Sequence, residues 1–250
     1  MYKINLNCDL GEGAPFDGLI IPQINSANIA CGFHAGDSMI IRRTIDLCRN
    51  YEVDIGVHPG YPDRENFGRT DMEVSPQQVY DFTIYQLGAL GAMAGGRKKL
   101  THVKPHGAMY NQAAKNRLLA NAIVNAVYDY NKELILLALA NSQMISAARD
   151  RGLRYASEVF ADRAYEADGS LRPRKLEGAI ITDENEVIER VIKMIKLGKV
   201  TAYTGEETDI EAHSVCVHGD GEKALLFVKK LREAFVNNNI ETVRLTEAIG

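Results

Sequence analysis

The chain has 250 residues, 46% of them hydrophobic and 25% charged, and a formal net charge of −4 at pH 7. This composition is typical of a globular protein, and we expect residues 1–250 to form a single domain because no linker-like segment interrupts them. The net negative charge gives no sign of a nucleic-acid-binding protein, which would need a basic face. The chain has no uninterrupted stretch of about 18 apolar residues, so no membrane span is predicted. An N-terminus without a secretory pattern and cysteines without a C-x-x-C pair predict a cytoplasmic protein.

The first hundred residues alternate between predicted strands and predicted helices. Apolar runs that end in turn residues predict strands at 3–9, 26–33 and 53–57. Helical spacing after the N-cap candidate Asp37 predicts a helix over 38–50. Ser75-Pro76 opens a longer helix, which ends at the pair Gly95-Gly96.

The rest of the chain continues this alternation. Strands are predicted at 101–104, 133–140, 154–160 and 214–218. Helices are predicted near 113–130, after the capping residue Asn141, at 186–197 and at 222–236. Repeated βα units build a parallel sheet covered by helices, and seven of them in a chain of this length favour a closed (β/α) barrel over an open sheet.

Polar side chains occupy one face of the first predicted strand. Successive strand residues point to opposite faces, so Asn5, Asn7 and Asp9 share one face while the alternate positions are apolar. The same parity aligns three polar residues around the fourth strand, namely His102, Lys104 and His106. In a helix-covered barrel this face is interior, and the polar strand ends meet at the carboxyl rim, where barrel enzymes carry their active sites.

All six histidines lie at or beside predicted strands. A single histidine is most often structural, but several at equivalent strand ends predict one shared site. Imidazoles and carboxylates with a lysine, in a chain without the motif G-x-S-x-G, favour general acid–base activation of water, with the lysine stabilising negative charge. The candidate catalytic residues are Asp9, His58, Lys104 and His106.

The same side chains could hold a divalent metal, because imidazole and carboxylate are common metal ligands. Neither HExxH nor another regular ligand spacing supports a metal, so no metal ligand is assigned and the metal stays an open alternative. The glycines in 11–13 and 91–98 do not complete a nucleotide-binding loop. We therefore expect no ATP site in the chain itself.

Six segments carry a family resemblance that runs from Asn5 to about Asp220. They are NCDLGEG, NIACGFHAGD, GVHPGYPD with FGR, HVKPHGAMYN, EVFADRAY and CVHGD. In this order they resemble the signature blocks of the lactam-utilisation family, whose members form the A subunit of bacterial and archaeal 5-oxoprolinase. One departure is that the family usually continues with Thr-Pro-Gly-Ala after the last block, where this chain has residues 221–224, GEKA.

The resemblance implies a seven-stranded (β/α) barrel similar to glycoside hydrolase and deacetylase folds. It also implies opening of the small lactam 5-oxo-L-proline to L-glutamate, with ATP as a cosubstrate of the complex and subunits B and C as the partners that phosphorylate the lactam. Residues of the family blocks are candidates for substrate binding, and the guanidinium forks of Arg69 and Arg163 suit a carboxylate. The candidates are Glu12, His34, Asp63, Arg69, Asp162, Arg163, His218 and Asp220.

Two alternatives stay open. The first is a metal-dependent deacetylase or amidase that acts alone on an N-acyl substrate, which the histidine and aspartate content also suits. The second is a non-catalytic scaffold subunit, in which the polar strand ends form only a buried hydrogen-bond network. Reconstitution with the partner subunits and metal analysis of the purified chain separate these alternatives.

Overall fold

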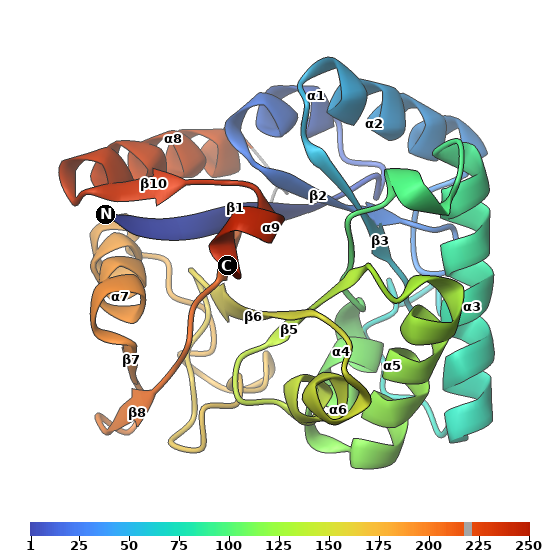
Figure 1. Ribbon diagram of the computed structural model, residues 1–250. Coiled ribbons are helices and arrows are strands. Elements are labelled where there is room, and N and C mark those ends of the chain that lie inside the picture. The colour runs from blue at the N-terminus through green and yellow to red at the C-terminus, as the bar shows by residue number, and fades with distance from the viewer. Residues whose placement is uncertain (218–221) are drawn as a thin grey trace.

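Seven parallel strands close into a barrel in the computed structural model, which describes residues 1–217 and 222–250, without the side chains of residues 222–224. The strands are β1 (Tyr2–Leu10), β2 (Ser26–Ala30), β3 (Asp54–His58), β4 (His102–Val103), β5 (Ile135–Leu139), β6 (Tyr155–Phe160) and β9 (Ser214–Val217). Each strand pairs with the next, and β9 pairs with both β6 and β1, which closes the ring (Figure 1). The predicted α/β barrel is confirmed.

Helices cover the outside of the barrel (Figure 1). They are α2 (Ser38–Asn50), α3 (Pro76–Met93), α4 (Gly107–Lys115), α5 (Arg117–Asn131), α6 (Gln143–Arg151), α7 (Glu184–Leu197) and α8 (Glu222–Asn237). Asp37 caps α2 by accepting hydrogen bonds from two backbone N–H groups, and Ser75 and Gln78 form a capping box at α3, so both predicted helix starts are confirmed. Among the described residues, none of the helices has the length and apolar character to cross a membrane.

Two helix predictions were wrong in detail. The helix expected near 113–130 is two helices, α4 and α5, because Asn116 between them has an extended backbone (φ −107°, ψ 110°) and its side chain caps α5. The cap expected at Asn141 is instead Ser142, whose hydroxyl accepts from the Ile145 N–H, while Asn141 lies in a turn with φ 64°.

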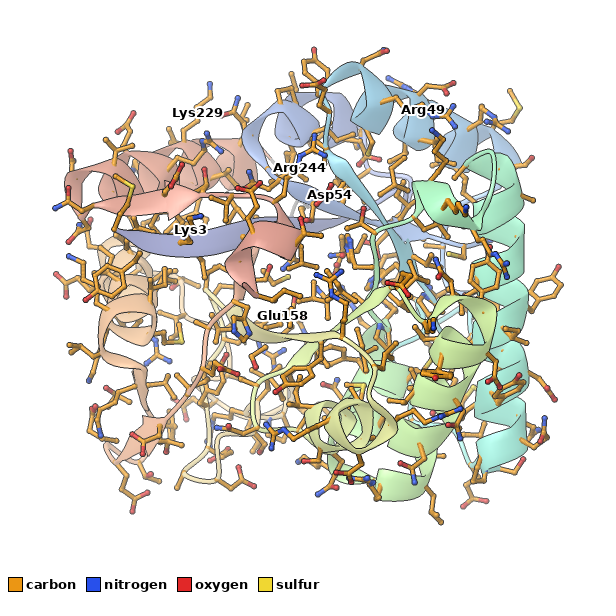
Figure 2. All side chains as sticks on the ribbon, viewed as in Figure 1. Lys3, Arg49, Asp54, Glu158, Lys229 and Arg244 are labelled. Atoms are coloured by element: carbon orange, nitrogen blue, oxygen red, sulfur yellow. The ribbon has the colours of Figure 1, made fainter. Side chains whose placement is uncertain are left out.

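Shorter elements close the end of the barrel at which the strands begin. β10 (Ile240–Thr242) adds to the start of β1, and α9 (Leu245–Ala248) packs Leu245 against the first residues of β5 and β6. Figure 2 shows Arg244 beside Asp54 at this end, with 3.7 Å between Nη1 and Oδ1. The remaining elements are α1 (Asp17–Ile20), η1 (Ile21–Gln23), η2 (Arg97–Lys99) and the hairpin of β7 (Lys199–Thr201) and β8 (Glu207–Asp209). The opposite end carries the long loops.

The inside of the barrel is lined by polar side chains that form hydrogen bonds with one another, although His102 Nδ1 makes none with the described residues. The Asn28 amide donates to Asn7 Oδ1 and to Asp9 Oδ1, each at 2.8 Å, and its own oxygen lies 2.7 Å from His102 Nε2. Nearer the end of the barrel at which the strands begin, the Ser214 hydroxyl donates to Asn5 Oδ1 at 2.7 Å. Buried polar groups without partners would destabilise the fold, so this ladder explains how β1 tolerates a polar inner face.

Candidate active site

A cavity of about 860 Å³ opens at the carboxyl ends of the strands. Its floor carries side chains from the end of β1, the loop after it, the end of β3 and the segment after β4. They are Asp9, Glu12, His58, Lys104 and His106. The four predicted catalytic residues therefore share one cavity, although almost a hundred positions separate the first from the last along the chain.

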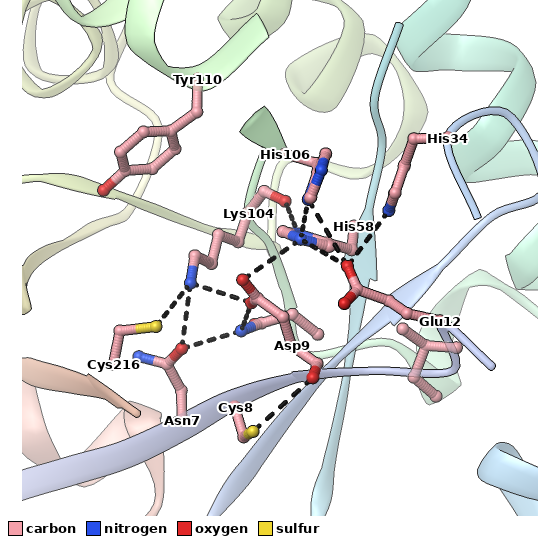
Figure 3. Close-up of polar contacts among 12 residues, drawn as sticks. Asn7, Cys8, Asp9, Glu12, His34, His58, Lys104, His106, Tyr110 and Cys216 are labelled. Atoms are coloured by element: carbon pink, nitrogen blue, oxygen red, sulfur yellow. Dashed lines mark hydrogen bonds and ion pairs between the residues drawn. The ribbon is translucent and has the colours of Figure 1, made fainter. Parts of the chain in front are cut away.

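Lys104 is the centre of a buried charge network. Its ammonium lies 2.9 Å from Asp9 Oδ1 and 3.1 Å from the sulfur of Cys216 (Figure 3). Glu158 Oε1 lies 2.9 Å from the same ammonium. Burial alone would lower the pKa of Lys104, but Asp9 leads the groups that outweigh burial and hold the pKa well above its usual value. Lys104 is therefore a cation whose N–H donors are all engaged.

Asp9 faces a histidine with its second oxygen. Oδ2 lies 3.4 Å from His58 Nε2, while Oδ1 is held by Lys104 and Asn28. Burial would raise the pKa of Asp9, but His58 and Lys104 together hold it well below its usual value. Burial would likewise lower the pKa of His58, but Asp9 raises it above the usual value. Asp9 therefore stays ionised near neutral pH.

Three imidazoles surround the Glu12 carboxylate. Glu12 Oε1 lies 3.4 Å from His34 Nε2, 3.5 Å from His106 Nδ1 and 3.9 Å from His58 Nε2. The rings of His34 and His106 stack with their centroids 3.8 Å apart. Burial lowers the pKa of His34, and lowers that of His106 to about 3, so both rings are neutral near pH 7. One ligand atom from each of the four side chains lies within 4.8 Å of all the others, so together they could hold a metal ion.

The predicted substrate-binding residues divide between the cavity and its surroundings. Glu12, Arg69 and Arg163 line the cavity, and His34 lies buried behind Glu12. The exposed Arg69 guanidinium lies over the Phe67 ring, 4.8 Å from its centroid.

Two further candidates, Asp63 and Asp162, lie outside the cavity lining. The Asp63 carboxylate accepts from Asn66 Nδ2 at 2.8 Å and so shapes its own loop. The Asp162 backbone carbonyl accepts from the Ile181 N–H, and neither aspartate is among the residues that line the cavity. His218 and Asp220 lie outside the described residues.

Arg163 holds a loop in place at the cavity wall. It is 4% exposed, its guanidinium donates to the carbonyl oxygens of Arg172 and Ala179, and burial lowers its pKa to about 10. The loop it supports brings two exposed cations, Arg174 and Lys175, to the cavity. The upper wall is therefore positive above a floor of carboxylates and imidazoles.

The candidate residues predicted from sequence omitted part of the network. Glu158 is fully buried and accepts from Tyr110 Oη at 2.7 Å and from Asn7 Nδ2 at 3.0 Å. Its inward position follows from strand parity, since it lies two residues before Phe160 in a predicted strand. Tyr110 follows His106 by four residues, one helical turn, which is the spacing that could have predicted their proximity.

Nearly the whole chain matches a known protein family. The model of the LamB/YcsF family matches residues 4–250. A protein of Clostridium beijerinckii, named as the A subunit of 5-oxoprolinase, is 52% identical over 251 residues, which cover 98% of each chain. The crystal structure of a lactam utilization protein from Thermus thermophilus is similar with a TM-score of 0.88 and 39% identity, over 97% of this chain and 99% of that one. A family 4 carbohydrate esterase from Streptomyces lividans is similar in fold alone, with a TM-score of 0.52 and 10% identity over 96% of this chain and 91% of that one.

Proposed function

This chain belongs to the LamB/YcsF family, and from that premise we propose that it is the component of an ATP-dependent 5-oxoprolinase in which water opens the lactam ring. The substrate is 5-oxo-L-proline in a phosphorylated form, and the product is L-glutamate. ATP is a cosubstrate of the complex and is used by partner subunits B and C, since this sequence carries no complete phosphate-binding loop. The supporting observation is a floor of carboxylates and imidazoles in one cavity whose wall is cationic.

The chemistry of a lactam requires two proton transfers. A lactam carbon is a poor electrophile because the ring nitrogen donates electron density into the carbonyl group, and phosphorylation of the carbonyl oxygen makes that carbon open to attack. Water must lose a proton as it adds, and the ring nitrogen must gain one as the C–N bond breaks. The acyl phosphate that this leaves on the opened chain then reacts with a second water, which gives L-glutamate and inorganic phosphate. A site for the ring opening needs a base and an acid on the same side of one cavity.

Asp9 suits the role of base in this proposal. Lys104 and Asn28 hold its Oδ1, which leaves Oδ2 as the oxygen that can accept a proton from water. The neighbouring imidazoles of His58 and His106, whose facing nitrogens are 2.9 Å apart, can deliver a proton to the ring nitrogen. Lys104 acts as a positioning residue for Asp9, because its N–H groups are engaged and cannot also bind a developing oxyanion.

The cationic wall suits an anionic lactam. Arg69, Arg174 and Lys175 line the cavity and are exposed, so they can attract a substrate that carries a carboxylate and a phosphoryl group. A guanidinium can bind a carboxylate through two parallel hydrogen bonds. The cavity volume of about 860 Å³ leaves room for both groups.

Reconstitution with partner subunits B and C tests the proposal. We expect glutamate and ADP only in the complete mixture, and we expect Asp9→Asn to lower the rate of glutamate formation by about 100-fold or more while the subunits still assemble. Asp37→Asn is the matched control, because it makes the same chemical change outside the cavity and asparagine also caps helices. Full glutamate formation by the Asp9→Asn complex would refute the catalytic role.

A second variant covers the case in which Asp9→Asn weakens the fold. His58→Gln leaves the ion pair of Asp9 with Lys104 intact, and we expect it to lower glutamate formation as well. Ring opening by the chain alone, without ATP or partners, would favour the amidase alternative. Normal turnover with both variants would favour the scaffold alternative.

A further inference from the structure

Four side chains at the floor of the cavity converge on one point from four separate segments. Glu12 follows β1, His34 follows β2, His58 ends β3 and His106 precedes α4. Figure 3 shows their polar atoms turned toward one another. The facing atoms of these residues are 2.9 to 3.9 Å apart along the contacts described above.

Backbone carbonyls set the orientation of two of these rings. His58 Nδ1 lies 2.7 Å from the Lys104 carbonyl oxygen, and His106 Nε2 lies 2.8 Å from that of Phe67. A carbonyl oxygen only accepts hydrogen bonds, so these two ring nitrogens carry the protons. In neutral rings the opposite nitrogens, His58 Nε2 and His106 Nδ1, are then bare, and they face each other at 2.9 Å. Two nitrogen lone pairs at this distance repel each other unless a proton or a metal cation lies close to both of them.

His34 supplies an independent observation. Its side chain is buried, and neither ring nitrogen makes a hydrogen bond. The surrounding backbone leaves room for the ring only because two glycines approach it: a Cβ at Gly60 would lie 2.5 Å from His34 Nδ1, and one at Gly68 would lie 2.7 Å from His34 Cβ. Its nearest charged group is Glu12, whose Oε1 lies 3.4 Å from His34 Nε2 without a hydrogen bond between them. A buried imidazole that makes no hydrogen bond is costly, which points to a ligand that its nitrogen binds.

We propose that Glu12, His34, His58 and His106 bind one divalent transition-metal ion of the zinc class. Three imidazole nitrogens and one carboxylate oxygen suit zinc, cobalt or nickel rather than magnesium or calcium, which prefer oxygen ligands. A tetrahedral site with bonds near 2.05 Å has ligand atoms about 3.3 Å apart. The contacts of 2.9 to 3.9 Å lie on both sides of this value, and the widest separation among the four ligand atoms is 4.8 Å, so the ion would draw the ligands slightly together. Hydrogen bonds from the outer ring nitrogens to backbone carbonyls are the usual support of metal-binding histidines.

The inference goes beyond the proposed function, because it concerns what these rings bind whether or not a lactam is the substrate. With His58 Nε2 and His106 Nδ1 on the ion, these two rings would not also be the proton donors of the proposed ring opening, whereas the role of Asp9 as base would be unchanged. Metal binding is measured on the purified chain without partners or substrate, and glutamate formation on the complete complex. Either result can fail while the other stands.

The experiment strips the chain with a chelator and titrates it with zinc and with cobalt. We expect one ion per chain, and a visible cobalt spectrum of a four-coordinate nitrogen and oxygen site. His34→Ala and Glu12→Gln should each weaken binding by about 100-fold or more. The control is His213→Ala, because His213 lies outside the cluster and contacts the Ser157 N–H and Glu211.

Circular dichroism of each variant establishes that it is folded before the titration is interpreted. A folded chain that binds no stoichiometric metal would overturn the proposal, and His58 and His106 would then share a proton. Binding that is equally tight in the wild type, His34→Ala and Glu12→Gln would also overturn it, because the metal would then sit elsewhere on the molecule.

Discussion

Replacing Lys104 by methionine removes the cation at the centre of the buried network while keeping an unbranched apolar side chain of similar length. The ammonium that is lost lies 2.9 Å from one oxygen of Asp9 and 2.9 Å from one oxygen of Glu158. Lys104 is 2% exposed and Glu158 is fully buried, so water cannot replace the missing cation at Glu158 without opening the barrel. The substitution therefore leaves a buried carboxylate without its counterion.

The expected loss in the free energy of unfolding is about 4 kcal/mol at pH 7, because removing one partner of a buried ion pair costs about 3–5 kcal/mol. Glu158→Gln should cost less, about 2 kcal/mol, since Lys104 keeps its pair with Asp9 and only charge-assisted hydrogen bonds to Glu158 are weakened. The double variant should lose less free energy of unfolding than the sum of the two single variants. In the double variant Glu158 is replaced by a neutral side chain, so the removal of Lys104 no longer leaves a buried carboxylate without a counterion.

The loss should shrink as the pH falls from 7 to 5. In the wild type, Lys104 helps to keep the pKa of Asp9 well below its usual value, so the stability that Asp9 contributes is present above the unfolded-state pKa of about 3.9 and is lost only as the pH falls through the lower, folded-state pKa. Without Lys104, a carboxyl group of the folded variant can take up a proton at a higher pH, which relieves the unpaired charge.

Urea unfolding followed by far-UV circular dichroism measures both effects. Lys98→Met is the matched control, because Lys98 is exposed on η2, and it should change the stability by no more than about 0.5 kcal/mol. A loss below about 1 kcal/mol for Lys104→Met, or a loss that grows toward pH 5, would show that the ammonium does not hold this network together.

Three further predictions concern the barrel interior and its helix caps. Gly56→Ala should lower the free energy of unfolding by about 2 kcal/mol or more in urea titrations, because the new Cβ would lie 2.0 Å from His102 Nε2, and adding His102→Ala should recover part of this loss. Burial lowers the pKa of His102 to about 3, so between pH 6.5 and 3 the unfolded chain binds a proton that the folded chain does not. Stability should therefore fall as the pH falls through this range, with a slope that approaches that of one bound proton in its middle, and His102→Gln should abolish this contribution. Asp37→Ala should cost about 1 kcal/mol in thermal or urea unfolding without changing turnover of the reconstituted complex; a catalytic defect would show that Asp37 does more than cap α2.

The architecture of this protein was predictable from local patterns. Apolar runs and turn residues located all seven barrel strands, because the two-residue period of a strand and the spacing of βα units are properties of the chain itself. The same period placed Asn5, Asn7 and Asp9 on the inner face of β1. Helix caps at Asp37 and Ser75 followed for a similar reason, since capping depends on residues within one turn of each other.

Local patterns failed where neighbouring conformations compete. Asn116 and Ser142 are helix caps, yet the residues beside them could equally continue or start a helix, and packing on the barrel decides between these outcomes. Asp63 and Asp162 stand in family blocks beside cavity residues, but their side chains are not among those that line the cavity. The position of a residue within a sequence block does not predict in which direction its side chain points when the residue lies in a loop.

Which strands form, and which of their side chains face inward, follows from the order of residues along the chain, because both depend on periodicities of a few residues. Which of the inward groups touch depends on how the barrel closes. Lys104 pairs with Asp9 and Glu158, and Glu12 meets His34, His58 and His106, because closure of the barrel brings the ends of separate strands within hydrogen-bond distance. Contacts of this kind join residues tens of positions apart, so the spacing of residues within one segment does not predict them.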